Sequence, residues 1–154
     1  MSPQVGIVMG SSSDRVVMDK AGEVLERFGV TYETHVMSAH RQPARVAEYA
    51  STADERGLKV IIAGAGLAAH LPGVVAAHTS LPVIGVPLYG DALAGADALY
   101  SCVQMPTGVP VATVAVGGAK NAAVLAVQVV AAGDDGLRDK IKDFKRELAE
   151  GLKL

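Results

Sequence analysis

The segment Ser38-Ala39-His40-Arg41 places a titratable imidazole beside a fixed cation, directly after the predicted strand 32–37. Imidazole can both accept and release a proton near neutral pH, because its unperturbed pKa lies close to that value. The planar guanidinium of Arg41 suits a phosphate or a carboxylate. The pair therefore predicts proton transfer by His40 next to a bound anion. A solvated loop, or a histidine packed in the core, is the alternative interpretation.

A second candidate is the segment Gly10-Ser11-Ser12-Ser13-Asp14, which precedes a predicted helix. Serine hydroxyls and free backbone N–H groups at a helix N-terminus suit an anion such as phosphate. The carboxylate of Asp14 could accept hydrogen bonds from ribose hydroxyls. Simple N-capping by Ser12 or Ser13 explains the same residues equally well. Neither G-x-G-x-x-G nor G-x-x-x-x-G-K-[ST] occurs here, which disfavours dinucleotide and P-loop binding.

The remaining reactive side chains form no obvious cluster. The segment 64–73 carries no charge before His70, so it could bring only backbone close to a ligand. We expect His70 to be a structural residue at a helix start, and His35 and His78 to be structural as well. With scattered histidines and a single cysteine, no metal site is predicted. Cys102 is interpreted as a small packed thiol.

Length and charge exclude several classes of protein. The chain has 154 residues, and its net charge is -2 from 14 basic and 16 acidic side chains, so we expect one domain that binds neither nucleic acid nor a membrane surface. The single cysteine excludes an intrachain disulfide and fits a reducing compartment. The first residues show no basic region before an apolar core, so no signal peptide is expected. These features predict a cytoplasmic protein.

The chain is unusually apolar, with 50% hydrophobic residues and a mean hydropathy of +0.31. No Asp, Glu, Lys or Arg occurs between residues 60 and 90. A membrane span would need a helix of about 20 residues, which the glycines and prolines in this stretch would break. Two buried strands and a helix of small residues explain it better. The surplus of apolar residues also suggests burial against other subunits.

Hydrophobic periodicity predicts alternating strands and helices. This order indicates an α/β fold, a three-layer, doubly wound parallel sheet of the flavodoxin-like type. In such sheets ligands bind at the carboxyl ends of the strands, where all the polar and glycine-rich segments fall. We expect one catalytic domain over residues 1–154, with a core at about 5–132 and a C-terminal amphipathic helix at about 135–153. The expected strands are 5–9, 32–37, 60–63, 82–86 and 111–116, and the longer helices are 17–28, 46–53, 92–103 and 119–132.

These segments together resemble one family. Gly10–Asp14, Ser38–Arg41, Ala63–Gly73, Ser101–Gly108 and Ala119–Ala122 recur in this order, with similar spacing, in the catalytic subunits of phosphoribosylaminoimidazole carboxylase. The likeness runs from about residue 5 to about residue 132. It is greatest for the class I branch, the 5-(carboxyamino)imidazole ribonucleotide mutases of de novo purine biosynthesis.

The resemblance implies an enzyme that moves a carboxylate from the exocyclic nitrogen of an imidazole ribonucleotide to ring carbon C4, without metal or organic cofactor. His40 matches the catalytic histidine, acting first as general acid and then as base. Ser11 and Arg41 would hold the phosphate and Asp14 the ribose. Further pocket residues would be Ser13, Ser38, Ala65, Gly66, Leu67 and Ala68. The family is typically homo-octameric, so a homo-octamer is expected.

Two positions depart from the family pattern, and two other functions stay open. Leu67 stands where the family usually has glycine, and Tyr89-Gly90-Asp91 is unusual for the loop after the fourth strand. Another branch of the family carboxylates aminoimidazole ribonucleotide directly with carbon dioxide. A flavodoxin-like module that binds a nucleotide or flavin without catalysis is the alternative from a different class.

Overall fold

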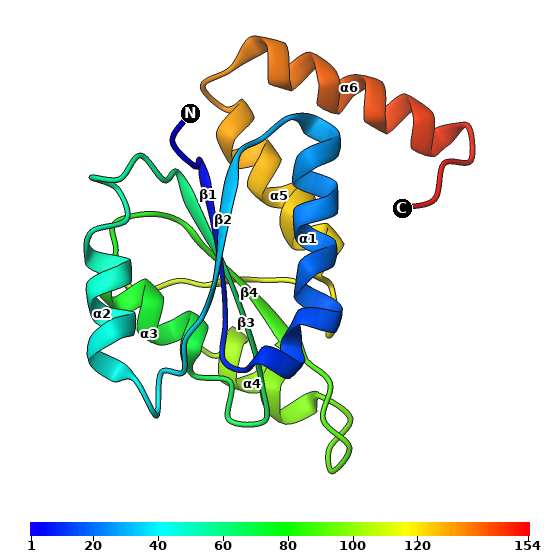
Figure 1. Cartoon of the computed structure of the whole chain (residues 1–154). Coiled ribbons are helices and arrows are strands. Elements are labelled where there is room, and N and C mark those ends of the chain that lie inside the picture. Colours follow the sequence, from blue (N-terminus) through cyan, green and yellow to red (C-terminus); the bar gives the residue numbers. More distant parts are fainter.

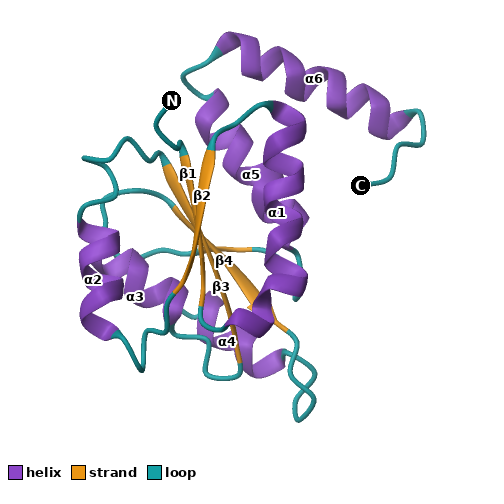
Figure 2. Cartoon of the chain, viewed as in Figure 1, coloured by secondary structure: helices purple, strands orange, loops and turns teal.

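The computed structural model describes residues 1–154 and shows a five-stranded parallel sheet with helices on both faces (Figure 1). The strand order is β2-β1-β3-β4-β5, the flavodoxin-like order, so the predicted fold class is confirmed. Figure 2 shows the helices flanking the twisted sheet. The elements are β1 (Val5–Met9), a 3-10 helix (Ser12–Asp14), α1 (Arg15–Phe28), β2 (Tyr32–Val36), α2 (Pro43–Ser51), β3 (Val60–Gly66), α3 (Leu71–His78), β4 (Val83–Leu88), α4 (Ala96–Val103), β5 (Ala112–Thr113), α5 (Ala119–Ala131) and α6 (Asp135–Ala149).

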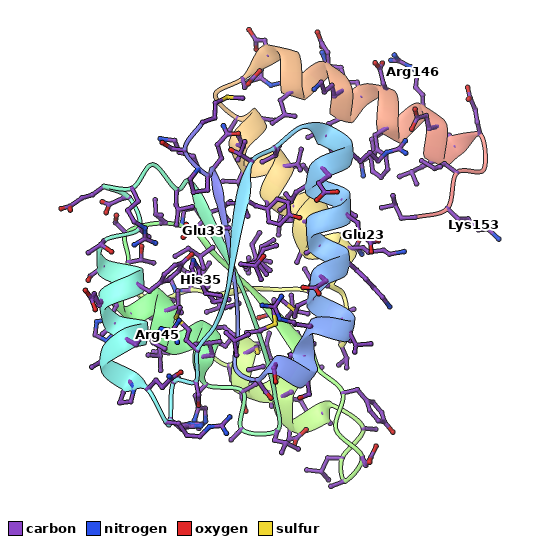
Figure 3. The ribbon with its side chains drawn as sticks, viewed as in Figure 1. Glu23, Glu33, His35, Arg45, Arg146 and Lys153 are labelled. Atoms are coloured by element: carbon purple, nitrogen blue, oxygen red, sulfur yellow. The ribbon has the colours of Figure 1, made fainter.

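The sheet separates two hydrophobic cores, and alternate side chains of its strands pack into one core or the other. In β3, Val60 and Ile62 pack with α1 and α5, whereas Ile61 and Ala63 pack with α2, α3 and α4. Successive side chains of a strand point to opposite faces, which is why a strand buried on both sides reads as a continuous apolar run. Charged side chains lie outside: Figure 3 shows Glu23, Arg45 and Arg146 on the outer surfaces of their helices.

The uncharged stretch 60–90 consists of β3, the short helix α3 and β4, as predicted. Its strands are almost completely buried at the centre of the sheet. No helix of the protein is long and apolar enough to cross a membrane. The apolar character of this stretch therefore follows from burial inside the fold.

The fifth strand is much shorter than predicted, two residues in place of the expected 111–116. The carbonyls of Gly85 and Pro87 on β4 accept hydrogen bonds from Val114 and Gly117 at 3.1 and 2.8 Å, so this side of β4 faces the fifth strand. Proline has no N–H to donate there. The regular ladder therefore ends at Thr113, although the chain continues beside β4 to Gly117.

Two other boundaries differ from the prediction. α4 begins at Ala96 and not near residue 92, because Ala94 and Gly95 have φ angles of 53° and 85°, which no right-handed helix accepts. β3 continues to Gly66 and not only to residue 63, since Gly66 still pairs with Leu88. The first part of the predicted glycine loop is thus strand.

α6 is held to the body mainly through its aromatic residue and its first turns. Phe144 is buried and meets Phe28 edge to face with ring centroids 5.3 Å apart. Lys140 donates a 3.0 Å hydrogen bond to the carbonyl of Phe28, at the end of α1. Leu148, one turn further along α6 than Phe144, stays 36% exposed. The far end of α6 extends beyond the rest of the molecule (Figure 1).

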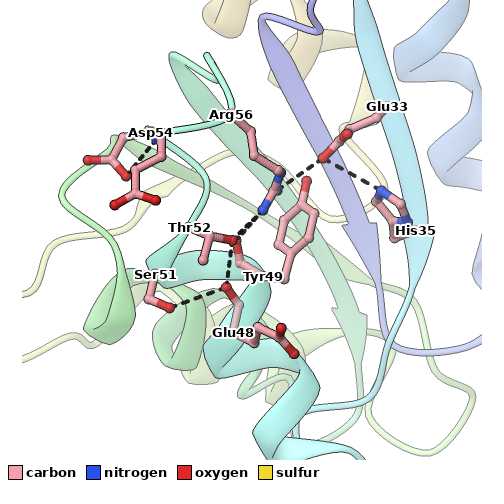
Figure 4. A network of polar contacts seen from close by, with 9 residues as sticks. Glu33, His35, Glu48, Tyr49, Ser51, Thr52, Asp54 and Arg56 are labelled. Carbon is pink, nitrogen blue, oxygen red and sulfur yellow. Dashed lines mark hydrogen bonds and ion pairs between the residues drawn. The ribbon is translucent and has the colours of Figure 1, made fainter.

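A polar network covers the edge strand β2 on the side of α2 (Figure 4). Glu33 pairs with Arg56 at 3.2 Å and approaches His35 at 3.6 Å. The Arg56 guanidinium lies 4.5 Å from the ring centroid of Tyr49, whose buried hydroxyl has no hydrogen-bond partner. Burial, together with the neighbouring Glu33 carboxylate, raises the pKa of Tyr49. His35 belongs to this network and lies outside the cavity described below.

We predict that Gly64→Ala destabilises the fold and that Gly66→Ala, in the same strand, does so far less. A Cβ at Gly64 would overlap the Met18 Sδ atom and lie 2.7 Å from its Cε, and Met18 is completely buried. Overpacking of this kind costs about 1–3 kcal/mol. A Cβ at Gly66 would meet Leu88 at an ordinary 3.6 Å. Urea denaturation measures both variants, and equal losses would contradict the packing argument.

Candidate active site

The loops that follow β1, β2, β3 and β4 enclose a cavity of about 460 Å³ at the carboxyl edge of the sheet. It lies across the ends of β1 and β3, from which the chain order proceeds in opposite directions through the sheet. Ligands of open α/β sheets bind at such a switch point. The structure brings every predicted site residue to this cavity: Ser11, Ser13, Asp14, Ser38, His40, Arg41, Ala65, Gly66, Leu67 and Ala68.

The serine segment after β1 is organised by reciprocal capping. Ser13 N–H donates to Ser11 Oγ at 3.4 Å, and Ser11 N–H donates to the Asp14 carboxylate at 3.0 Å. The predicted capping role therefore falls on Ser11, not on Ser12 or Ser13, and it concerns the short 3-10 helix before α1. The Ser11 and Ser13 hydroxyls lie 3.0 Å apart and both line the cavity. This capping therefore fixes the orientation of the Ser11 and Ser13 hydroxyls, which a bound ligand would contact.

Partial burial disfavours the charged form of Asp14 in this position. Partial burial raises the pKa of its carboxyl, and the hydrogen bond from the Ser11 N–H lowers it in part. Desolvation disfavours the charged form of an acid, and hydrogen bonds to that form favour it. A carboxylate kept in a half-buried position despite this cost is a candidate for ligand contact.

Arg41 joins the loop after β2 to the loop after β1. Its Nε donates to Ser38 Oγ at 3.3 Å, and its Nη2 donates to the carbonyl of Gly10 at 3.4 Å. Both acceptors are neutral, and no carboxylate lies within ion-pair distance of this guanidinium. The side chain is exposed at the cavity. It therefore presents a positive charge without a direct ion-pair partner next to the serine segment.

His40 contacts a second histidine that the sequence did not assign to the site. Its Nε2 lies 2.7 Å from Nδ1 of His70, and the two rings meet nearly at right angles. His70 stands at the predicted helix start, before α3, but its side chain makes no capping bond there. The predicted place at the helix start is confirmed, and the contact of its ring with His40 is a feature that the sequence did not indicate. The place of His70 directly after β3, at the same edge as His40, was the signal available in the sequence.

The backbone after β3 turns tightly over the cavity. Leu67 has a φ angle of 54°, in the left-handed region that a leucine rarely adopts. Two short-range hydrogen bonds of 2.8 Å follow, from Ala69 N–H to the carbonyl of Leu67 and from His70 N–H to the carbonyl of Ala68. This turn connects the small-residue wall of the cavity directly to His70.

Some predicted features lie elsewhere. The segment 117–121 after β5 does not line the cavity, because β5 is the far edge of the sheet. Cys102 is fully buried in α4, and burial raises the pKa of its thiol to about 11, in line with the packed thiol expected. No group of three or more His, Cys, Asp or Glu side chains is arranged to hold a metal ion. The loop after β4 adds Tyr89, Gly90 and Asp91 to the cavity.

Comparison with known proteins identifies the family. The model of the family described as "AIRC: AIR carboxylase" matches residues 4–151. The chain belongs to the AIR carboxylase family. It is 58% identical to the N5-carboxyaminoimidazole ribonucleotide mutase of Vibrio vulnificus over 97% of this chain and 94% of that protein. It is 57% identical to the mutase of Pyrococcus abyssi, over 95% and 84%. This confirms the resemblance found in the sequence.

Solved structures of the AIR carboxylase family share the fold. The crystal structure of Treponema denticola PurE superimposes with a TM-score of 0.87 and 33% sequence identity, over 96% of this chain and 92% of that one. A second structure of PurE from this organism, PurE2-S38D, gives a TM-score of 0.88 at 32% identity. The family likeness therefore extends over the sheet, the cavity loops and the C-terminal helix.

We predict that Asp14→Asn raises the free energy of unfolding at pH 7 and that this gain disappears below about pH 4, the pKa of an unfolded Asp. Folding raises the pKa of Asp14, so its contribution to stability decreases as pH rises through the unfolded and folded values. Asn can still accept the hydrogen bond from Ser11. Urea denaturation at the two pH values measures the difference.

The matched control is Asp139→Asn on α6. A hydrogen bond from Lys142 lowers the pKa of this exposed carboxyl, so its small contribution to stability is present at pH 7 and lost as pH falls. The two variants should change stability in opposite directions. A loss of stability at pH 7 in Asp14→Asn would argue against an electrostatic cost at the cavity.

Proposed function

We propose that this protein is an N5-carboxyaminoimidazole ribonucleotide mutase of de novo purine biosynthesis. It converts 5-carboxyamino-1-(5-phosphoribosyl)imidazole to 5-amino-1-(5-phosphoribosyl)imidazole-4-carboxylate, an intramolecular transfer of a carboxyl group and so an isomerase reaction. The supporting relatives carry this name at 55–58% identity over nearly the whole chain. The observation that carries the proposal is the meeting of His40, Arg41, Asp14 and the serine segment in one cavity.

The phosphoribosyl group is bound by the loops after β1 and β2. The free guanidinium of Arg41 and the hydroxyl of Ser11 hold the phosphate, since both face the same cavity from adjacent loops. Asp14 accepts hydrogen bonds from the ribose hydroxyls. Ser13 and Ser38 line the same side. This arrangement leaves the imidazole ring near His40 and the small residues 65–68.

Catalysis proceeds by loss and recapture of carbon dioxide. Protonated His40 gives its proton to the exocyclic nitrogen as the carbamate C–N bond breaks and carbon dioxide forms. Ring carbon C4 then attacks the carbon dioxide, and neutral His40 removes the C4 proton. One imidazole thus serves as acid and then as base, and the proton balance closes without an outside donor.

His70 positions this imidazole. The 2.7 Å contact between His40 Nε2 and His70 Nδ1 fixes the ring of an otherwise exposed side chain. The ring nitrogen that carries the proton determines which edge of the His40 ring can donate that proton to the substrate. Neither histidine is buried, and His40 is the one that lines the cavity.

The whole chain works as one catalytic domain in the cytoplasm, without a cofactor, and assembles into a homo-octamer. Large apolar side chains remain exposed on the single chain, including Val16 at 78%, Tyr100 at 65% and Val103 at 47%. Exposed apolar surface of this kind is typical of subunit contacts. Light scattering on the purified protein measures the assembly.

A two-substrate comparison tests the reaction, on protein freed of metal ions. One sample receives the carbamate ribonucleotide with carbon dioxide kept low, and the other receives aminoimidazole ribonucleotide with bicarbonate. We predict that the C4-carboxylate forms in the first sample and hardly in the second. The reverse result would make the protein a carboxylase that uses free carbon dioxide. No reaction in either, together with a yellow purified protein, would favour a flavin-binding module.

Substitutions at the two neighbouring residues should separate chemistry from binding. We predict that His40→Asn abolishes turnover but retains ribonucleotide binding, because the general acid and base is lost while the phosphate site is intact. Arg41→Ala should weaken binding by about 1.5–3 kcal/mol, the value of a hydrogen bond to a charged group. Calorimetry gives the affinities, and product formation gives the rates.

The chain offers matched controls for both variants. His78→Asn replaces an exposed histidine at the end of α3, and Arg45→Ala replaces an exposed arginine on α2, both outside the cavity. Each should behave like the parent protein. Appreciable turnover by His40→Asn would eliminate the single-histidine mechanism.

A further inference from the structure

Tyr89 is an aromatic side chain that has no packing partner inside the chain. It follows β4 directly, lines the cavity and is 65% exposed. It belongs to neither hydrophobic core, and its ring contacts no other aromatic ring. Apart from the imidazole of His40, it is the only aromatic ring that lines the cavity. It is also one of the positions at which the loop after β4 departs from the family pattern.

The backbone around Tyr89 is held in place by contacts within the fold. A Cβ built on Gly95 would lie 3.5 Å from the Cα of Tyr89, so the end of this loop packs against its start. The next residue, Gly90, lies against Leu67 of the loop after β3, because a Cβ built on it would come within 2.8 Å of Leu67 Cδ2. The tyrosine ring therefore projects from a fixed point. Only the torsion angles of its own side chain remain to be ordered by a ligand.

The ring of Tyr89 stands at the end of the cavity opposite to the groups that suit a phosphate. Ser11 and Arg41 belong to the loops after β1 and β2, whereas Tyr89 follows β4. β3 lies between β1 and β4, so the loops after these two strands leave the sheet about 10 Å apart. The phosphate and the heterocycle are at opposite ends of a ribonucleotide. A ribonucleotide whose phosphate is bound at Arg41 therefore extends its heterocycle toward Tyr89.

We propose that Tyr89 stacks on the imidazole ring of the substrate and thereby selects ligands that carry a planar heterocycle. This inference rests on the proposed mutase function. Two aromatic rings attract each other in an offset stack, beyond the gain from buried area alone. Tyrosine supplies such a surface at a low cost in conformational entropy. The two aromatic side chains of the cavity then divide the work: His40 moves the proton, and Tyr89 binds the ring.

The test compares two ligands that differ by the heterocycle. Aminoimidazole ribonucleotide carries the imidazole ring, and ribose 5-phosphate carries only the sugar and the phosphate. Calorimetry gives the affinity of each ligand for the parent protein and for the variants. A defect in folding, in assembly or in the phosphate site weakens the binding of both ligands. Loss of stacking weakens only the binding of aminoimidazole ribonucleotide.

Substitutions of Tyr89 separate the ring from the rest of the side chain. Tyr89→Leu keeps an apolar side chain without the aromatic ring, and we expect its affinity for aminoimidazole ribonucleotide to fall roughly tenfold. Its affinity for ribose 5-phosphate should equal that of the parent. Tyr89→Phe retains the ring and should bind both ligands like the parent. In turnover, Tyr89→Leu should raise KM and leave kcat nearly unchanged, because the stack forms in the ground state and in the transition state alike.

The matched control is Tyr100→Leu. Tyr100 is 65% exposed on α4, as much as Tyr89, but it does not line the cavity. This variant should bind both ligands like the parent. Tyrosine fluorescence gives a second readout, since the chain has four tyrosines and no tryptophan. Aminoimidazole ribonucleotide should quench part of this fluorescence in the parent and in Tyr100→Leu, but not in Tyr89→Leu.

Three outcomes would overturn the proposal. Equal affinity of the parent and Tyr89→Leu for aminoimidazole ribonucleotide would show that the ring does not stack. A loss in Tyr89→Phe as large as in Tyr89→Leu would assign the contact to the hydroxyl. An equal loss for both ligands, with a changed mass in light scattering, would assign Tyr89 to a subunit contact.

The design keeps this proposal separate from folding and from the mutase function. A thermal melt shows whether each variant folds, and Tyr89→Ala, which also lacks the ring, carries the test if Tyr89→Leu does not fold. Failure of the mutase function looks different, because the parent would then give no C4-carboxylate from the carbamate ribonucleotide. The ratio of the two affinities would still report whether Tyr89 binds the heterocycle.

Discussion

The site depends on a constraint of register: β2 and β3, which are not neighbours in the sheet, are both aligned by β1. β1 lies between them, and its last residue, Met9, pairs with Val36 of β2 and with Gly64 of β3. The loops that carry His40 and His70 therefore leave the same edge of the sheet, on either side of the loop after β1, with β3 continuing to Gly66. A shift of one residue in either pairing would turn alternate side chains to the other face and separate the two rings.

The sequence was sufficient to predict the parallel sheet, its order of elements and the edge at which the site lies. A strand that is buried on both faces needs apolar residues at nearly every position, whatever the exact packing around it. The carboxyl ends of parallel strands necessarily share one edge of the sheet. The roles of Ser11, His40 and Arg41 were predicted from side-chain chemistry and family resemblance. Their arrangement in one cavity is a property of the fold.

The features that the sequence did not predict depend on the direction of a side chain, on the N–H group that proline lacks, or on a contact between two loops. The contact of the His70 ring with His40 joins two loops that are 30 residues apart in the sequence. The shortness of β5 follows from Pro87, whose missing N–H matters only because that side of β4 faces β5. The contact of Leu67 with Gly90 joins residues from two loops, and no local pattern in the sequence connects them.

The hydrogen bonds of Arg41 affect how an anion binds in the cavity. The guanidinium is oriented by a hydroxyl and a carbonyl, and not by a carboxylate. An arriving anion therefore displaces no counter-charge of the protein, and little rotameric freedom remains to be lost on binding. Two carboxylates, Asp14 and Asp91, line the same cavity, so the attraction of Arg41 for an anion acts at close range, through the donors of its guanidinium, and not by steering the ligand from a distance.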